Sequence, residues 1–180
     1  HFGERYRTVF SNGKEIILEN RQVLPKAWLV SQVAQEADPA KRLQRMLAPD
    51  FDPSRLALVE SAPPFALAGG TNQPGKVQVT TSKPAEMVLV AEITTNSLLV
   101  VGEKYYQGWI ATVDGKPTEI VPVNHTLRGV YLTPGKHTVA FRFDPLPFRI
   151  GKWLTLASFG LFTLVALREW LLHRSRNSAS

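Results

Sequence analysis

Apolar and polar positions alternate along much of the second half of the chain, in the pattern of β-strands. In residues 77–80 and 139–143 the side chains alternate strictly between apolar and polar or small. Residues 87–93 and 98–101 are almost continuously apolar, which is typical of central strands that are covered on both faces. These segments predict a β-sheet protein rather than a helical one.

Turn signals separate the predicted strands at nearly regular intervals. Asp114-Gly115 predicts a hairpin within residues 109–123, and Pro134-Gly135 predicts a second hairpin within residues 129–143. Asn12-Gly13 accepts the positive φ angles of a type I′ turn and predicts a third hairpin near the start. With about eight to ten short strands, the expected fold is mainly β, an antiparallel β-sandwich or jelly-roll-like domain.

The first half adds two strands and one short soluble helix. Residues 24–30 predict a half-buried strand, and residues 56–60 predict another. The helix is expected at about residues 39–48, because Asp38 can cap it and Pro39 fits its first turn. Apolar residues also recur at helical spacing, at Ala40, Leu43, Met46 and Leu47.

A charge-free apolar run from Trp153 to Leu167 follows the β-rich part directly. Lys152 and Arg168 flank it and can extend their charges outward, while Trp153 and Trp170 lie where interfacial aromatic residues are expected. The run predicts a transmembrane helix; a buried or surface-lying helix is the alternative, but a surface-lying helix needs one charged face. We therefore divide the chain into a β-domain at 1–147, a transmembrane helix at 148–172 and a basic tail at 173–180.

The net charge of +6 comes largely from the region around this helix, since residues 141–180 carry six Lys and Arg against Asp144 and Glu169. Basic residues beside a membrane helix typically face lipid head groups. The rest of the chain has no stripe of Arg with interleaved aromatic residues, so nucleic-acid binding is not expected.

No recognisable active site emerges from the motifs. The chain has no cysteine, and its four histidines form no HExxH pattern, so neither a thiolate nor a common zinc site is expected. It also has no GxSxG, Walker or dinucleotide-binding GxGxxG motif. We predict no catalytic residue, no metal ligand and no cofactor.

A cluster of aromatic and polar side chains around Gly108 is the main candidate for ligand binding. Aromatic faces beside hydrogen-bonding groups suit a sugar ring, and a nearby amide and guanidinium could contact its substituents. The alternative is that the aromatic residues belong to the core at a strand end, with the others in turns and at strand edges. The six candidate carbohydrate-binding residues are Glu103, Tyr105, Tyr106, Trp109, Asn124 and Arg128.

Three segments together resemble the C-terminal region of the YfhO family of bacterial multi-pass membrane proteins. They are residues 20–30, 47–60 and above all 98–153. The resemblance depends on an ordered set of positions followed by a closing transmembrane helix. These positions are Tyr105-Tyr106, Gly108-Trp109, Val113-Asp114-Gly115, Asn124, Arg128-Gly129, Pro134-Gly135 and Phe141.

This resemblance implies a GT-C-type glycosyltransferase that takes sugar from a polyprenyl-phosphate carrier and modifies cell-envelope glycopolymers. It implies that the catalytic residue lies in an early extracytoplasmic loop outside these residues, so none is carried over. The β-domain would lie on the extracytoplasmic side, where it positions the acceptor or braces the catalytic bundle, and the tail would be cytoplasmic. The implied partners are the lipid bilayer, upstream membrane helices, and an envelope glycan or polyprenyl-phosphate sugar.

Two other hypotheses for the function of the chain remain open. It could be a membrane-tethered carbohydrate-binding module that uses the aromatic cluster, or a scaffold domain that docks a protein partner. Glycan binding lost on replacement of Trp109 would favour the first, and an exposed apolar patch would favour the second.

Overall fold

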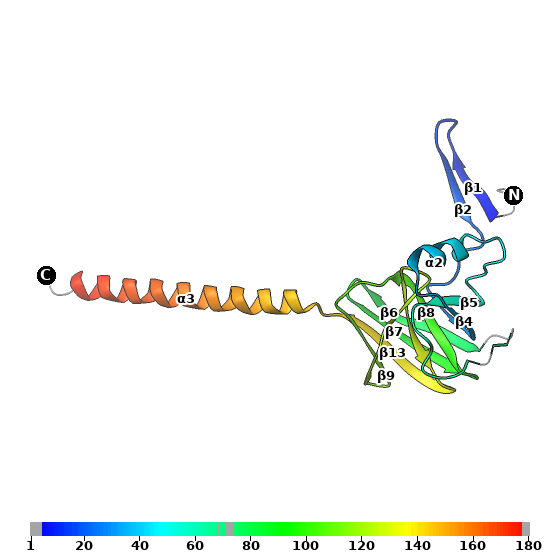
Figure 1. Cartoon of the computed structure of the whole chain (residues 1–180). Helices are drawn as coiled ribbons and strands as arrows, with labels where there is room; N and C mark the ends of the chain where they lie inside the picture. The colour runs from blue at the N-terminus through cyan, green and yellow to red at the C-terminus, as the bar shows by residue number, and fades with distance from the viewer. Residues whose placement is uncertain (1–4, 68, 71–73, 178–180) are drawn as a thin grey trace.

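The computed structural model describes residues 5–67, 69–70 and 74–177, which form a β-sandwich, a separate hairpin and a long C-terminal helix (Figure 1). The five-stranded sheet has the order β10 (Lys116–Thr118), β9 (Trp109–Val113), β13 (Gly135–Phe143), β7 (Glu86–Ile93), β6 (Gly75–Lys83). The six-stranded sheet has the order β3 (Ala27–Val30), β8 (Ser97–Lys104), β12 (Leu127–Leu132), β11 (Val121–Val123), β5 (Leu56–Val59), β4 (Gln32–Gln35). The mainly β prediction is confirmed.

The main core lies between the two sheets. It includes Leu89 and Phe141 from the five-stranded sheet and Leu99 and Val130 from the six-stranded sheet, all fully buried. A second cluster, which includes Trp28, Val100 and Val123, covers the opposite face of the six-stranded sheet. Because this sheet is covered on both faces, residues 98–101 of β8 are a continuous apolar run, and all four residues of β3 are buried rather than half-buried as predicted.

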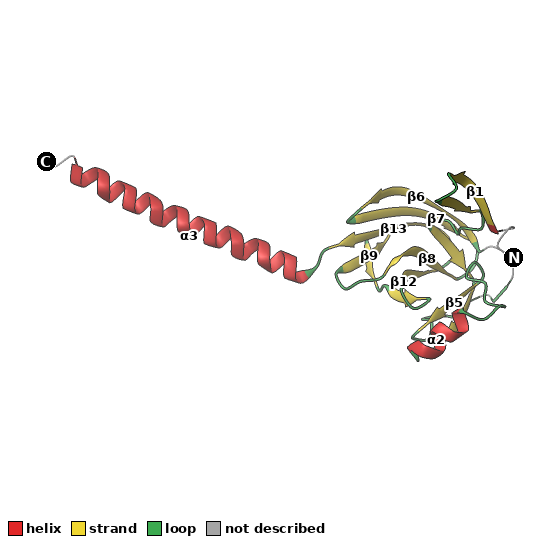
Figure 2. Ribbon diagram, turned by 90° about the horizontal axis from the view of Figure 1, so that it is seen from above, coloured by secondary structure: helices red, strands yellow, loops and turns green. Residues whose placement is uncertain are grey.

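The predicted turns have different outcomes. Asp114-Gly115 forms the expected two-residue hairpin turn between β9 and β10, with φ angles of 52° and 77°. Pro134-Gly135 was wrongly predicted as a hairpin turn, because it carries the chain from β12 in one sheet to β13 in the other (Figure 2).

The N-terminal hairpin exists, but its turn differs from the prediction. It joins β1 (Tyr6–Ser11) to β2 (Ile16–Asn20) and stands apart from the sandwich. Four residues rather than two connect the strands, and the Asn12 Oδ1 atom accepts hydrogen bonds from the backbone N–H groups of Lys14 and Glu15. The two-residue type I′ turn is therefore wrong here, since only Gly13 of the pair has a positive φ.

One strand pair departs from the antiparallel arrangement. β4 runs parallel to β5, with Gln32 opposite Leu56 and Gln35 opposite Val59. Helix α2 (Pro39–Met46) lies between them in sequence and makes this parallel crossover.

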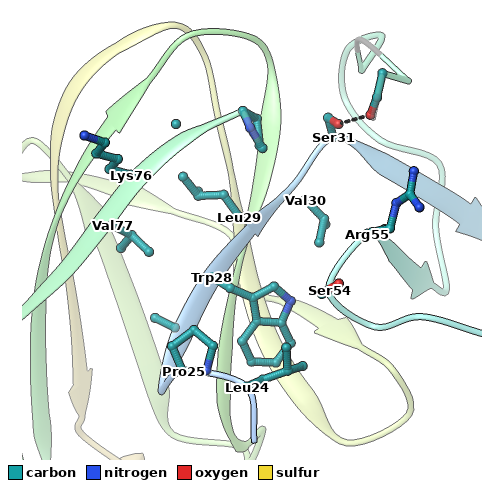
Figure 3. A pocket seen from close by; sticks show the side chains of 14 residues that line it. Leu24, Pro25, Trp28, Leu29, Val30, Ser31, Ser54, Arg55, Lys76 and Val77 are labelled. Carbon is teal, nitrogen blue, oxygen red and sulfur yellow. Dashed lines mark hydrogen bonds between the residues drawn. The ribbon is translucent and has the colours of Figure 1, made fainter. Parts of the chain in front are cut away.

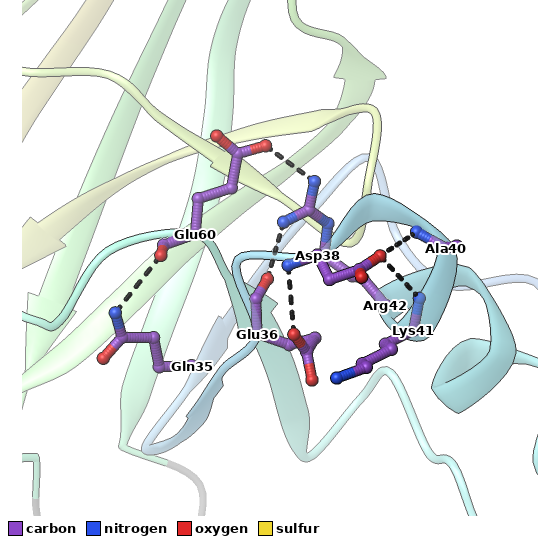
Figure 4. A network of polar contacts seen from close by, with 7 residues as sticks. All are labelled: Gln35, Glu36, Asp38, Ala40, Lys41, Arg42 and Glu60. Atoms are coloured by element: carbon purple, nitrogen blue, oxygen red, sulfur yellow. Dashed lines mark hydrogen bonds and ion pairs between the residues drawn. The ribbon is translucent and has the colours of Figure 1, made fainter.

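Helix α2 begins as predicted but buries a different side chain. The Asp38 carboxylate accepts hydrogen bonds from the N–H groups of Ala40 and Lys41, which caps the helix. The apolar residues at helical spacing are not the buried ones, because Leu43 is 46% exposed whereas Arg42 is only 3% exposed. The Arg42 guanidinium donates to Glu60 Oε1 and to the Glu36 carbonyl, each at 2.7 Å (Figure 4). A salt bridge, not apolar packing, joins this helix to the end of β5.

Helix α3 (Leu146–Asn177) extends away from the sandwich as one straight rod (Figures 1 and 2). Its segment Leu146–Arg168 is long and apolar enough to cross a membrane, and none of that segment is buried. At 1.5 Å per residue, its 23 residues span about 34 Å, slightly more than a hydrocarbon layer of about 30 Å. The helix starts two residues before the predicted position, so only Asp144 and Pro145 separate it from β13.

Candidate functional site

The aromatic cluster lies at the end of the sandwich from which α3 leaves. Three backbone hydrogen bonds hold this end together: Tyr105 N–H to the Thr126 carbonyl at 2.7 Å, Phe143 N–H to the Ala85 carbonyl at 2.9 Å, and Asp144 N–H to the Gly108 carbonyl at 2.7 Å. We call it the membrane-proximal end, defined by loop 105–108, turns 84–85 and 124–126, and linker 144–145. The cluster therefore lies beside the start of α3, the helix that is long and apolar enough to cross a membrane.

Arg128 is the buried charge at the centre of this end. Its side chain is 1% exposed and donates from Nη2 to Glu103 Oε2 at 2.6 Å and from Nη1 to the Lys104 carbonyl at 3.2 Å. The other carboxylate oxygen of Glu103 pairs with Lys26 Nζ at 3.0 Å. Burial lowers the pKa of Arg128, and the charge of Glu103 partly opposes this shift. We call Lys26, Glu103 and Arg128 the ion-pair network.

Trp109 is packed within this end. The Arg128 guanidinium carbon lies 3.8 Å from the Trp109 ring centroid, in a cation–π contact, and the Phe143 ring centroid lies 5.4 Å away. With one face covered by Arg128, the half-buried Trp109 ring is mainly a packing element.

The two tyrosines differ in exposure. Tyr105 is half-buried, whereas Tyr106 is 64% exposed, with its ring centroid 6.4 Å from that of Phe143. Tyr106 is therefore the aromatic side chain of the predicted set that is open to a ligand or to lipid.

Asn124 differs from the other five predicted residues in what its side chain contacts. It is 2% exposed, and its Oδ1 atom accepts a hydrogen bond from the Leu58 N–H at 2.8 Å, while its own N–H donates to the Leu58 carbonyl at 2.9 Å. Its φ of 46° lies in the left-handed region, which Asn adopts more readily than most residues. Its side chain is used to join β11 to β5, so we leave it out of the proposed binding surface.

A tight joint connects the sandwich to α3, and sequence reasoning did not find it. Gly108 has a φ of 107°, and a Cβ atom added there would lie 2.9 Å from the Pro145 Cβ and 3.0 Å from the Phe143 ring. The one sequence feature that pointed to this joint is Gly108, which lies between aromatic residues. It could not identify the partner of Gly108, because linker 144–145 is far away in sequence. Lys26 was also missed, because nothing near it in sequence points to Glu103.

A second polar contact lies at the opposite end of the sandwich. Asp114 Oδ2 is 2.7 Å from His137 Nδ1, His137 Nε2 is 3.0 Å from the Thr133 carbonyl, and Asp114 Oδ1 accepts the Thr138 N–H. The hydrogen bond with His137, followed by the Thr138 N–H, lowers the pKa of Asp114 below its ordinary value of 3.8. This contact ties the β9–β10 turn to β13.

The lowered pKa of Asp114 predicts a dependence of stability on acid pH. A carboxylate with a lower pKa in the folded state stabilises the fold above its unfolded pKa, and this contribution is lost as the pH falls through the folded pKa. We expect the difference in thermal midpoint between the original protein and Asp114→Asn to be constant near pH 6 and to shrink below about pH 4. Thermal unfolding in detergent, followed by circular dichroism, measures this difference in midpoint. A difference that is unchanged at pH 2.5 would contradict the lowered pKa of Asp114.

An open cleft of about 660 Å³ lies between the edge strands β3 and β6 (Figure 3). Leu24, Trp28, Leu29 and Val77 line it, and Lys76 lies at its rim. None of the six predicted binding residues lines this cleft. Within residues 5–67, 69–70 and 74–177, no group of three or more His, Asp or Glu side chains could hold a metal ion.

A comparison with known protein families identifies a match for this chain. The family model described as "Bacterial membrane protein YfhO" matches residues 66–155, which is half of the chain. No curated protein and no solved structure matches this chain. The matched segment includes strands β6 to β13, the joint and the first turns of α3. The chain therefore belongs to the YfhO family of bacterial membrane proteins.

Proposed function

We propose that this chain is the non-catalytic C-terminal portion of a polytopic glycosyltransferase that uses a polyprenyl-phosphate sugar and modifies cell-envelope glycopolymers. In this proposal the β-domain lies on the extracytoplasmic side. It positions the acceptor polymer or braces the catalytic helices, and the chain after α3 returns to the cytoplasm. The resemblance to GT-C-type enzymes is the basis for the reaction class.

The joint is the observation that carries the bracing role. A domain that only needs to be near the membrane can be attached by a flexible linker, but here Asp144 N–H is hydrogen-bonded to the Gly108 carbonyl and Pro145 packs against Gly108. The family match crosses this joint, from residue 66 to residue 155. A fixed angle between the sandwich and α3 favours a role in holding other parts of the protein in place.

The test is the sugar content of envelope polymers in the bacterium that makes this protein. Deletion of the gene should remove one sugar substituent, detected by composition analysis of the purified polymers. Gly108→Ala should reduce that substituent toward the deletion level while the protein still accumulates in the membrane, because the new Cβ meets Pro145 and Phe143.

Gly13→Ala is the matched control for Gly108→Ala. Gly13 also has a positive φ of 83°, but nothing lies within 4 Å of an added Cβ, so the substituent should remain at its normal level. A deletion strain with unchanged envelope sugars would contradict the glycosyltransferase proposal. Normal sugars in Gly108→Ala, with an altered deletion strain, would contradict only the bracing role.

Carbohydrate binding by the β-domain is the second candidate, favoured by the exposure of both Tyr106 and Lys104 at this end of the sandwich. Trp109→Ala is a poor test because that ring packs under Arg128. Tyr106→Ala is the informative variant, with Phe10→Ala, at an exposed aromatic residue on the hairpin, as its control. Glycan-array binding that is lost in Tyr106→Ala and kept in Phe10→Ala would support this candidate.

A further inference from the structure

We propose that the membrane-proximal end of the sandwich is itself a lipid-binding surface. Tyr106 and Ile110 lie in the headgroup layer, and a surplus of cations around them contacts anionic phospholipids. This inference applies whichever side of the membrane the sandwich occupies, and it does not depend on the proposed enzymatic reaction.

The short linker brings the sandwich to the bilayer. Two residues span at most about 7 Å, which is comparable to the thickness of a headgroup layer, about 5 to 8 Å on each side. The segment able to cross the membrane begins at Leu146 itself, and Leu146 and Phe148 are 63% and 70% exposed. This spacing leaves no room for a separate water layer between loop 105–108 and the lipid head groups.

The exposed side chains at this end suit an interface. Tyr106 is 64% exposed and Ile110 is 45% exposed, although most large apolar side chains of the sandwich are buried. Tyrosine combines an apolar ring with a polar hydroxyl, and it is enriched where membrane meets water. Ile110 lies opposite Arg142 on the outer face of the five-stranded sheet, so an apolar and a cationic group lie side by side.

Charge at this end favours anionic lipids. At this end and in the first turns of α3, six exposed cations accompany the carboxylates Glu86, Glu103 and Asp144, apart from the buried Arg128. These cations are Lys26, Lys83, Lys104, Arg142, Arg149 and Lys152. Within the described part of the chain, Lys104, Arg149 and Lys152 have no carboxylate within 4.0 Å. A cationic surface beside a membrane helix attracts anionic headgroups, and the attraction is screened by salt.

The test uses the full chain in lipid nanodiscs, with a fluorophore on a single engineered cysteine. The chain contains no native cysteine, so Tyr106→Cys and Lys136→Cys each carry one thiol. Lys136 is near the far end of β13, about 23 Å along the strand from Phe143. Its loss removes only an exposed ion pair with Glu92. Lipids with a nitroxide on the headgroup quench a fluorophore that lies among the headgroups.

We expect quenching at position 106 to be several-fold stronger than at position 136. Replacing half of the zwitterionic lipid by phosphatidylglycerol should increase it further, and Lys104→Gln or high salt should reduce that increase. Equal quenching at both positions would overturn the proposal, and an absence of any effect of phosphatidylglycerol would overturn its anionic part. If Tyr106→Cys does not fold, Ile110→Cys is the second reporter, with the same expected result.

Discussion

Replacing Glu103 by glutamine should lower the free energy of unfolding of the sandwich by about 3 kcal/mol. Arg128 is 1% exposed, and Glu103 is the carboxylate that compensates its charge inside the fold. Glutamine keeps the size and one acceptor oxygen of Glu103 but removes that charge, so a buried cation is left without a counter-ion. Chemical denaturation in detergent, followed by circular dichroism, measures the change.

Arg128→Met should cost less than Glu103→Gln, about 1 to 2 kcal/mol, although Arg128 is the more buried partner. Methionine removes the buried charge and fills much of the same space, while Glu103 stays 34% exposed and paired with Lys26. Glu92→Gln, in an exposed pair with Lys136, is the control and should change stability by about 0.5 kcal/mol or less. A larger loss in Arg128→Met than in Glu103→Gln would show that the buried charge is not what makes the network costly to break.

Phe141→Ala should destabilise the sandwich by about 3 to 5 kcal/mol, the usual range for deleting a buried aromatic ring. Phe141 is completely buried in the main core, and its ring centroid lies 5.3 Å from the Arg128 guanidinium carbon. The substitution therefore leaves a cavity and also removes a neighbour of the ion-pair network.

Phe10→Ala is the matched control for Phe141→Ala, because Phe10 is 47% exposed on the separate N-terminal hairpin. We expect a change of about 0.5 kcal/mol or less for Phe10→Ala in the same denaturation experiment. Similar losses in the two variants would contradict the position of the core between the two sheets.

Local patterns were sufficient to predict most strands and the long apolar helix at the C-terminal end. The alternation in β6 and β13 and the apolar run of β8 follow directly from which faces are covered. The apolar run of β7 does not, because burial alternates along this strand and only one of its faces is fully buried. The Asp114-Gly115 turn needs two positive φ angles that this pair accepts, so its sequence was enough to define it. Helix α3 was predictable because an uninterrupted apolar run of membrane length is rarely anything other than a helix.

Features that depend on distant partners could not be predicted. Pro134-Gly135 has the residues of a hairpin turn, but whether β12 and β13 share a sheet depends on which strands each of them pairs with. The burial of Arg42 depends on Glu60, which is 18 positions away. The position of Arg42 within the helix does not indicate that it is buried.

The aromatic and polar cluster was predicted as a sugar-binding site, but the structure shows that part of it is packed. The six predicted residues lie at one end of the sandwich, but the Asn124 side chain bonds to the backbone of β5, Trp109 and Arg128 pack on each other, and Tyr106 remains exposed. The residues were singled out by chemical type, and type alone does not separate a packed ring from an exposed one.

Labelling of single cysteines with a membrane-impermeant maleimide tests most directly whether α3 crosses the membrane and leaves the sandwich outside the cell. In intact bacteria, Lys136→Cys should be labelled and Ser175→Cys should be labelled only after the membrane is permeabilised. Equal labelling of both positions in intact cells would contradict a crossing helix, and the reverse pattern would contradict an extracytoplasmic sandwich.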